Sequence, residues 1–169
     1  ATRNALSERT AAIIVEPIQG ESGVRPPPPG FLQGLRELAD ENGCLLIFDE
    51  VQTGIGRTGP LFAHQASGVE PDIMTLAKAL GNGIPIGAML TRASVGAVLE
   101  PGTPASTFGG NPLAAACAGV VLDTLIHGGI LAKAQEGAGQ LVRGLDAMAQ
   151  RLGSAGVFEV RGSGHLRAV

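Results

Sequence analysis

Three short apolar runs, each followed at once by a charged residue, constrain the fold of this chain more than any other feature. They span residues 11–15, 45–48 and 73–77, and the residues that follow them are Glu16, Asp49 with Glu50, and Lys78. Short apolar runs bounded by glycine, proline or charge are typical of buried strands. Residues 31–42, between the first two runs, carry apolar side chains at helical spacing, and Gly43 ends the pattern. Strands that alternate with helices predict an α/β fold with a mostly parallel sheet and helices on both faces.

Further elements follow the same reasoning. We expect helices at 61–67, 93–100, 112–126 and 130–152, and strands at 86–91, at 157–160 and after residues 161–164. Asn111 followed by Pro112 predicts the start of a helix, because asparagine caps helix N-termini and proline suits the first helical position.

Charge and cysteine content narrow the possible partners. The net charge of -3 argues against nucleic acid or an anionic membrane. The longest apolar stretch, residues 113–122, is shorter than the roughly 20 residues that span a bilayer.

Cys44 and Cys117 lack metal-type spacing, and we expect reduced cysteines in a cytoplasmic protein, with a disulfide as the alternative. The start without methionine and the end inside an apparent strand suggest a fragment.

The charged residues after the strands form a candidate site. Ligands of open α/β sheets bind at the carboxyl ends of the strands, so we expect Glu16, Asp49, Glu50 and Lys78 to share one crevice. Partial burial would favour the neutral, nucleophilic form of the Lys78 amine. Ion pairing at a sheet edge is the alternative explanation.

Pyridoxal phosphate fits this set of groups. Its aldehyde reacts with an amine, which Lys78 offers, and its protonated ring nitrogen needs a carboxylate such as Asp49. Gln52 can donate to the ring oxygen. Ser106-Thr107, followed by two glycines and the start of the Pro112 helix, supplies hydroxyl and N–H groups for a phosphate.

Five motifs occur in order along the chain. They are Glu16-Pro17-Ile18-Gln19-Gly20-Glu21, Asp49-Glu50-Val51-Gln52-Thr53-Gly54, Gly56-Arg57-Thr58-Gly59, Leu76-Ala77-Lys78-Ala79-Leu80-Gly81 and Ser106-Thr107-Phe108-Gly109-Gly110-Asn111-Pro112. Together they resemble the class III (ornithine-type) aminotransferases, and the acetylornithine enzymes most closely.

The resemblance implies fold type I. Residues 1–126 would then be the second half of the large, pyridoxal-phosphate-binding domain, and residues 127–169 a linking helix with the start of the small C-terminal domain. It also implies a homodimer with a shared active site. The reaction would move the terminal amino group of N-acetylornithine, or a related ω-amino donor, to 2-oxoglutarate, as in arginine biosynthesis.

Roles for individual residues come from the same resemblance. Lys78 would form the Schiff base and shuttle the proton, and Asp49 would pair with the pyridine nitrogen. The other cofactor-binding residues would be Glu50, Val51, Gln52 and Thr107, the last toward the partner subunit's cofactor. Ser106 would lie near the substrate, and Glu16 would be the switch glutamate that pairs with a substrate-binding arginine. Glu50 and Arg57 would otherwise be supporting residues, with a salt bridge within the loop as the alternative for Arg57, and no metal is expected.

The chain also departs from the family pattern. Pro104-Ala105 replace a usual His-Gly pair, Asn82 replaces glycine, and His165 replaces leucine, for which we expect a solvent-facing strand position. The Gly-Thr phosphate loop and the stacking aromatic residue of the family's first half are not in this sequence, and neither is the switch arginine. Three alternatives therefore stay open: a non-catalytic piece, an ornithine, succinylornithine or 4-aminobutyrate aminotransferase, and a cofactor-free Schiff-base lyase or aldolase.

Overall fold

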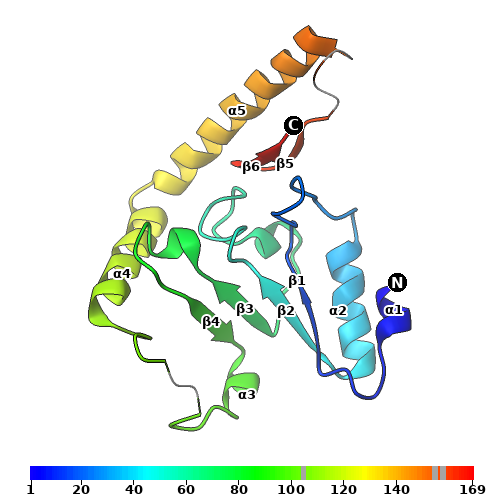
Figure 1. The fold of residues 1–169 in the computed structure, drawn as a ribbon, viewed down its shortest axis with the longest axis vertical. Helices are drawn as coiled ribbons and strands as arrows, with labels where there is room; N and C mark the ends of the chain where they lie inside the picture. The colour runs from blue at the N-terminus through cyan, green and yellow to red at the C-terminus, as the bar shows by residue number, and fades with distance from the viewer. Residues whose placement is uncertain (104–105, 154–155, 157–158) are drawn as a thin grey trace.

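A four-stranded sheet forms the centre of the computed structural model, which describes residues 1–103, 106–153, 156 and 159–169 (Figure 1). Its strands are β1 (Ala12–Val15), β2 (Leu45–Asp49), β3 (Ile73–Leu76) and β4 (Ala88–Thr91), in the order β1-β2-β3-β4. β1, β2 and β3 run parallel, and β4 is antiparallel to β3. The predicted α/β class and the mostly parallel sheet are thus confirmed.

The helices predicted from the sequence occur in the predicted order, and the short helix at Thr2–Ala5 was not predicted. The helices are α1 (Thr2–Ala5), α2 (Phe31–Asn42), α3 (Ala93–Gly96), α4 (Pro112–His127) and α5 (Ile130–Leu152), with 3₁₀ turns η1 (Ala63–Ala66) and η2 (Lys78–Leu80). Gly43 ends α2 with a left-handed φ of 64°, and the side chain of Asn111 accepts from the Ala114 N–H at the start of α4. The helices expected at 61–67 and 93–100 are shorter than predicted.

The C-terminal strands differ from the prediction. β5 (Arg161–Ser163) and β6 (Leu166–Ala168) form an antiparallel hairpin. Residues 161–164 were expected to separate two strands, but 161–163 are themselves a strand and the turn falls at 164–165, because Ser163 and Leu166 are partners in the hairpin ladder. Of the strand expected at 157–160, residues 157–158 lie outside the described residues and 159–160 are not strand. His165 is exposed, but it lies in the turn rather than in a strand.

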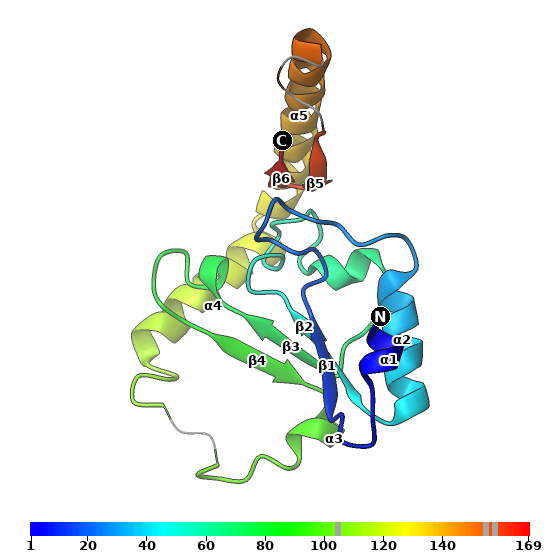
Figure 2. The same ribbon diagram turned by 45° about the vertical axis from the view of Figure 1, so that its right-hand side comes forward.

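One face of the sheet carries the core. Leu46 and Phe48 of β2 are fully buried beneath α2, and Met74 and Leu76 of β3 continue the same face toward α4 in a second cluster. Figure 2 shows α2 and α4 at opposite ends of the sheet. Burying a side chain of the size of Phe48 contributes about 1.5–3 kcal/mol, so these strands hold the residues that follow them in fixed positions.

The other face of the sheet is open at two points. Ile14 of β1 is 65 % exposed and Met89 of β4 is 53 % exposed. Successive side chains of a strand point to opposite faces, so both lie opposite the core face. A helix covers the core face at Leu46 and Phe48. On the opposite face, none of the described residues covers the sheet at Ile14 and Met89.

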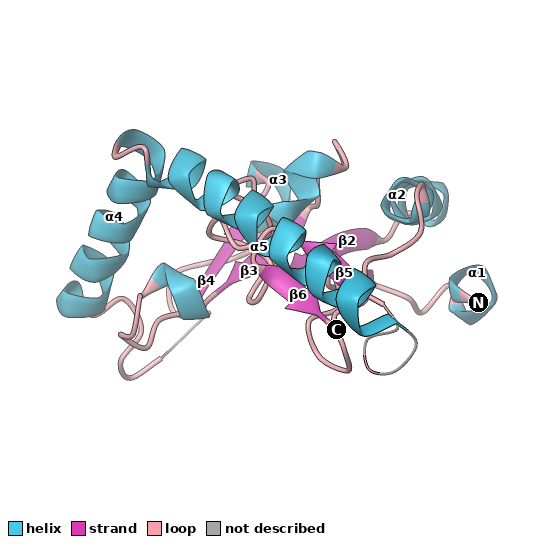
Figure 3. Ribbon diagram, turned by 90° about the horizontal axis from the view of Figure 1, so that it is seen from above, coloured by secondary structure: helices cyan, strands magenta, loops and turns pink. Residues whose placement is uncertain are grey.

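The β5–β6 hairpin is attached to the loop that follows β2. The hydroxyl of Ser163 donates to the Thr58 carbonyl at 2.8 Å, and the His165 N–H donates to the Arg57 carbonyl at 2.9 Å. A Cβ on Gly164 would lie 2.5 Å from the carbonyl carbon of Thr58, so this turn requires glycine. Seen from above, α5 crosses over the sheet with the hairpin beside it (Figure 3).

In the part of the chain that the structure describes, no single helix has the length and apolar character needed to cross a membrane. α4 and α5 have the required length and apolar character only when taken together, and the two helices are bent by 73° relative to each other.

Candidate active site

Lys78 lies just beyond the end of β3, where it begins η2. Its φ of 46° is in the left-handed region, which residues other than glycine rarely adopt and which is enriched at functional sites. Its side chain is exposed. The expected partial burial of Lys78 is therefore wrong for this structure, because η2 carries the residue past the sheet instead of keeping it in the strand.

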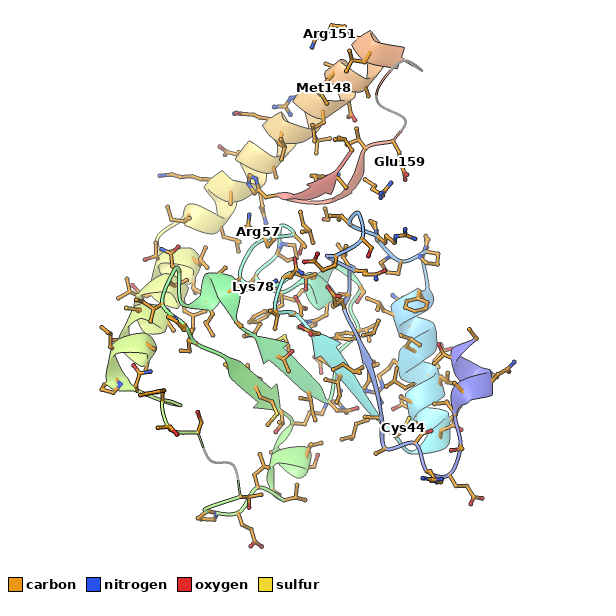
Figure 4. The ribbon with its side chains drawn as sticks, viewed as in Figure 1. Cys44, Arg57, Lys78, Met148, Arg151 and Glu159 are labelled. Carbon is orange, nitrogen blue, oxygen red and sulfur yellow. The ribbon has the colours of Figure 1, made fainter. Side chains whose placement is uncertain are left out.

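Asp49 ends β2, the neighbour of β3. Its Cα is the register partner of Thr75, three residues before Lys78, and its Oδ1 accepts from the Val51 N–H at 2.9 Å. Because β2 and β3 are parallel, Asp49 and Lys78 emerge at the same edge of the sheet, as predicted. Figure 4 shows Lys78 at this edge, beside the loop that carries Arg57.

Lys78 and Ser106 line one hollow of about 630 Å³. Gly109, Gly110 and Asn111, just before α4, line it as well. Small-molecule sites have volumes of about 300–1,000 Å³, so the hollow is large enough for a cofactor. The Ser106 hydroxyl accepts from the Gly109 N–H at 3.1 Å, and Thr107 beside it is exposed. The preceding Pro104 and Ala105 lie outside the described residues.

The loops after β1 and β2 meet at Gly20 and Glu21, which contact Glu16 and Gln52. Glu16 Oε2 accepts from the Gly20 N–H at 2.9 Å, and Gln52 Nε2 donates to Glu21 Oε1 at 3.0 Å. A Cβ on Gly20 would lie 2.7 Å from the Gln52 side chain, so glycine permits this close approach. Glu16 also lines a separate hollow of about 400 Å³ with Arg25 and Phe31, which shares no lining residue with the Lys78 hollow.

Glu50 points into the interior and not into the crevice expected for it. It is 1 % exposed, and its carboxylate accepts from the Thr53 hydroxyl, the N–H groups of Ala63 and His64, and His64 Nδ1, at 2.7–2.9 Å. Burial alone would raise the pKa of Glu50, but the hydrogen bonds from His64, Ala63 and Thr53 outweigh it and lower the pKa. The Glu50 side chain is therefore enclosed by its own loop and lies outside the crevice in which the sequence placed it.

The sequence analysis missed His64. Its ring stacks on Phe62 with centroids 5.9 Å apart and reaches the buried carboxylate of Glu50, 14 residues earlier. A histidine in a loop gives no periodic signal, so only the folded chain shows this contact. Asn82 has a φ of 46°, which confirms that asparagine tolerates the left-handed conformation at this position.

Comparison with known proteins identifies the family. The family Aminotransferase class-III matches residues 1–169. The chain belongs to the class III aminotransferases. It is 53 % identical over 166 residues to acetylornithine aminotransferase 1 of Bradyrhizobium diazoefficiens, covering 98 % of this chain and 41 % of the relative. It is 61 % identical over 120 residues to the succinylornithine transaminase of Salmonella paratyphi B, covering 71 % of this chain and 29 % of that protein.

Solved structures of this class III family share the fold. The acetylornithine aminotransferase from Elizabethkingia anophelis matches with a TM-score of 0.87 and 41 % identity, over 97 % of this chain and 43 % of that one. The ornithine aminotransferase from Toxoplasma gondii crystallised with oxidised glutathione matches with a TM-score of 0.86 and 43 % identity, over 96 % of this chain and 38 % of that one. This chain spans about two fifths of the length of the acetylornithine relatives. The resemblance to class III aminotransferases of fold type I is confirmed.

Class III aminotransferases depend on pyridoxal phosphate, and the described residues fit this cofactor. An amine and a carboxylate, from Lys78 and Asp49, emerge from neighbouring parallel strands. The hollow beside Lys78 is also lined by Ser106 and the glycines before α4, and backbone N–H groups at the start of a helix suit a phosphate.

Proposed function

We propose that this chain carries the cofactor-binding edge of an ornithine-type aminotransferase in the cytoplasm. The enzyme would transfer the terminal amino group of N-acetylornithine, or of a related ω-amino donor, to 2-oxoglutarate. The observation that supports this most is the shared edge of Asp49 and Lys78, with Lys78 in one hollow with Ser106. The chain covers only part of its relatives, so this proposal concerns the whole gene product.

Each side chain would have one task. Nζ of Lys78 would hold the cofactor covalently and, once a substrate amine had replaced it there, would carry the proton that leaves the substrate carbon bearing the amino group. Asp49 would accept a hydrogen bond from the pyridine N–H. Gln52 would donate to the ring oxygen, and Val51 would pack on the ring face. When bound, pyridoxal phosphate supplies the electron sink for the amino-group transfer.

The remaining predicted residues would serve phosphate and substrate. Thr107 would bind the phosphate of the partner subunit's cofactor, and Ser106 would lie near the substrate. Glu16 would pair with a substrate-binding arginine. Its hydrogen bond to the Gly20 N–H fixes one carboxylate oxygen, which leaves the other for such a partner.

A second copy of the chain would complete the dimer. Phe108 is 81 % exposed, and Leu113 and Val120, seven positions apart on α4, are 66 % and 67 % exposed. Large apolar side chains clustered on a surface mark interaction sites. We expect the double substitution Leu113→Glu with Val120→Glu to produce monomers in light scattering, whereas Val98→Glu, at a valine that is 73 % exposed, should not. A protein that is monomeric without substitution would refute the dimer.

Spectroscopy tests the cofactor assignment. The gene product that carries this sequence should develop a visible absorption band with pyridoxal phosphate. Borohydride should bleach the band, and Lys78→Ala should abolish it. The 169-residue chain should be tested in parallel. Its exposed apolar residues Ile14 and Met89 favour the alternative that this chain alone is a non-catalytic piece. Absence of the band in the gene product would refute the aminotransferase proposal.

An assay against four amino donors tests the substrate. N-acetylornithine, succinylornithine, ornithine and 4-aminobutyrate should each be offered with 2-oxoglutarate. We expect the highest kcat/KM for N-acetylornithine, given the relatives with that name. A preference for any of the other three would keep the reaction class and replace the donor.

A further inference from the structure

Glu50 is the best-anchored residue at the carboxyl edge of the sheet, although no catalytic task uses it. Its N–H donates to the Thr75 carbonyl of β3 at 3.0 Å, and its carbonyl accepts from the Gly54 N–H at 3.0 Å. Its two carboxylate oxygens accept four further hydrogen bonds, two of them from His64. Both backbone groups and the whole side chain of Glu50 are therefore engaged.

These contacts lie on one face of the sheet and Asp49 on the other. Phe48 belongs to the core, with its ring 6.1 Å from the His64 ring. Successive strand residues point to opposite faces, so Asp49 points away from the core and Glu50 points back toward it. An anchor at Glu50 therefore fixes the rotation of the strand end about its own axis, and with it the direction of the Asp49 carboxylate.

The loop that follows is held by the same anchor. Gly54 packs so closely that an added Cβ would lie 2.8 Å from the Glu50 carbonyl oxygen. Ile55 has a φ of 56°, which is strained for a β-branched residue and persists only when its surroundings enforce it. The carboxylate of Glu50 connects this loop to η1 through Ala63 and His64. Loss of that carboxylate would leave buried N–H groups without acceptors and release the strain.

We propose that Glu50, with His64 as its side-chain partner, is a positioning residue that holds Asp49 in the orientation needed to meet the cofactor's pyridine nitrogen. This inference rests on the proposed function, because it acts through the role of Asp49. A misplacement of about 1 Å at a reacting group can cost roughly 100-fold in rate, so a small rotation of the strand end suffices.

A double-mutant cycle on the gene product tests the inference. Glu50→Gln should lower kcat/KM by about 10- to 100-fold in the otherwise native protein. In an Asp49→Asn background the same substitution should have little further effect, because the residue through which it acts is already changed. An equal loss in both backgrounds would show a purely structural role for Glu50 and overturn the inference.

His64 supplies a milder variant in case Glu50→Gln does not fold. His64→Phe keeps the stack on Phe62 but removes the Nδ1 contact, whereas His64→Asn keeps a nitrogen donor near that position. We expect His64→Phe to weaken pyridoxal phosphate binding and lower kcat, and His64→Asn to restore both. Glu70→Gln, at a carboxylate that is 83 % exposed, is the matched control and should change neither. Equal behaviour of the phenylalanine and asparagine variants would overturn the role of His64.

Amide exchange gives a readout that needs no cofactor. The Val51 N–H is bonded to Asp49 Oδ1, so its exchange should accelerate in apo Glu50→Gln and in apo His64→Phe. Unchanged exchange in both variants would overturn the inference. Failure of the proposed function has another signature: the gene product would then show no visible absorption band with pyridoxal phosphate, whatever Glu50→Gln does to amide exchange.

Discussion

Removal of the Asp72 carboxylate should destabilise the protein through three lost contacts. Asp72 is 8 % exposed and lies just before β3. Its Oδ2 accepts from the Leu46 N–H and from Arg36 Nη1, both at 2.8 Å, and its Oδ1 lies 3.4 Å from Arg92 Nη1. It thus connects α2, β2 and the segment after β4 at the edge of the sheet remote from Lys78.

The expected cost of Asp72→Ala follows from these contacts. The buried Leu46 N–H would lose its acceptor, at about 1–3 kcal/mol. Arg36 would keep only Asp40, whose side chain is 66 % exposed, so the lost pair costs less than the about 3–5 kcal/mol typical of full burial. The contact with Arg92, whose side chain is 48 % exposed, adds little. We expect a loss of about 3 kcal/mol in the free energy of unfolding.

Urea denaturation of the purified gene product at pH 7 measures this loss. Asp40→Ala is the matched control, because it removes the exposed partner of the same arginine and should cost less than about 1 kcal/mol. Equal losses for the two variants, or a loss below about 1 kcal/mol for Asp72→Ala, would refute the reasoning from burial.

Three further outcomes are expected. Burial raises the pKa of Asp72, but the hydrogen bonds from Leu46 and Arg36 and the charges of Arg36 and Arg92 outweigh it, so the folded pKa is lowered. The advantage of the native protein over Asp72→Asn in the free energy of unfolding should therefore be full above the unfolded pKa of about 3.9 and vanish as pH falls through the folded pKa; a pH-independent difference in acid denaturation series would contradict this. Gly81→Ala would place a Cβ 1.9 Å from a backbone oxygen and should lower the melting temperature, whereas Gly87→Ala, whose nearest contact would be at 3.8 Å, should not; equal melting temperatures would argue against the close approach. Asn111→Ala removes the cap of α4 and should cost about 1 kcal/mol in urea, with Asn111→Asp as the control that keeps it.

The sequence predicted the elements well where one residue type has a clear local effect. Gly43 ends α2 because the chain there is left-handed, and Asn111 begins α4 because its side chain caps a free N–H. The shared edge of Asp49 and Lys78 was also predictable, since parallel strands end on the same side.

Contacts between segments that are distant along the chain could not be predicted from the sequence. Glu50 was grouped with Asp49 because the two are adjacent, yet the alternation of strand side chains sends them to opposite faces. Its partner His64 lies 14 residues away, and Asp72 meets Arg36 across 36 residues. The exposure of Lys78 depends on a left-handed residue that only the folded backbone shows.

The attachment of the β5–β6 hairpin has a mechanical consequence. The bonds from Ser163 and His165 to the backbone of Thr58 and Arg57, and the tight packing of Gly164, tether the hairpin to the loop. The hairpin cannot swing alone: either these contacts break, or residues 53–59 travel with it. A tilt of the C-terminal segment would therefore also move residues 53–59, the loop that follows Asp49.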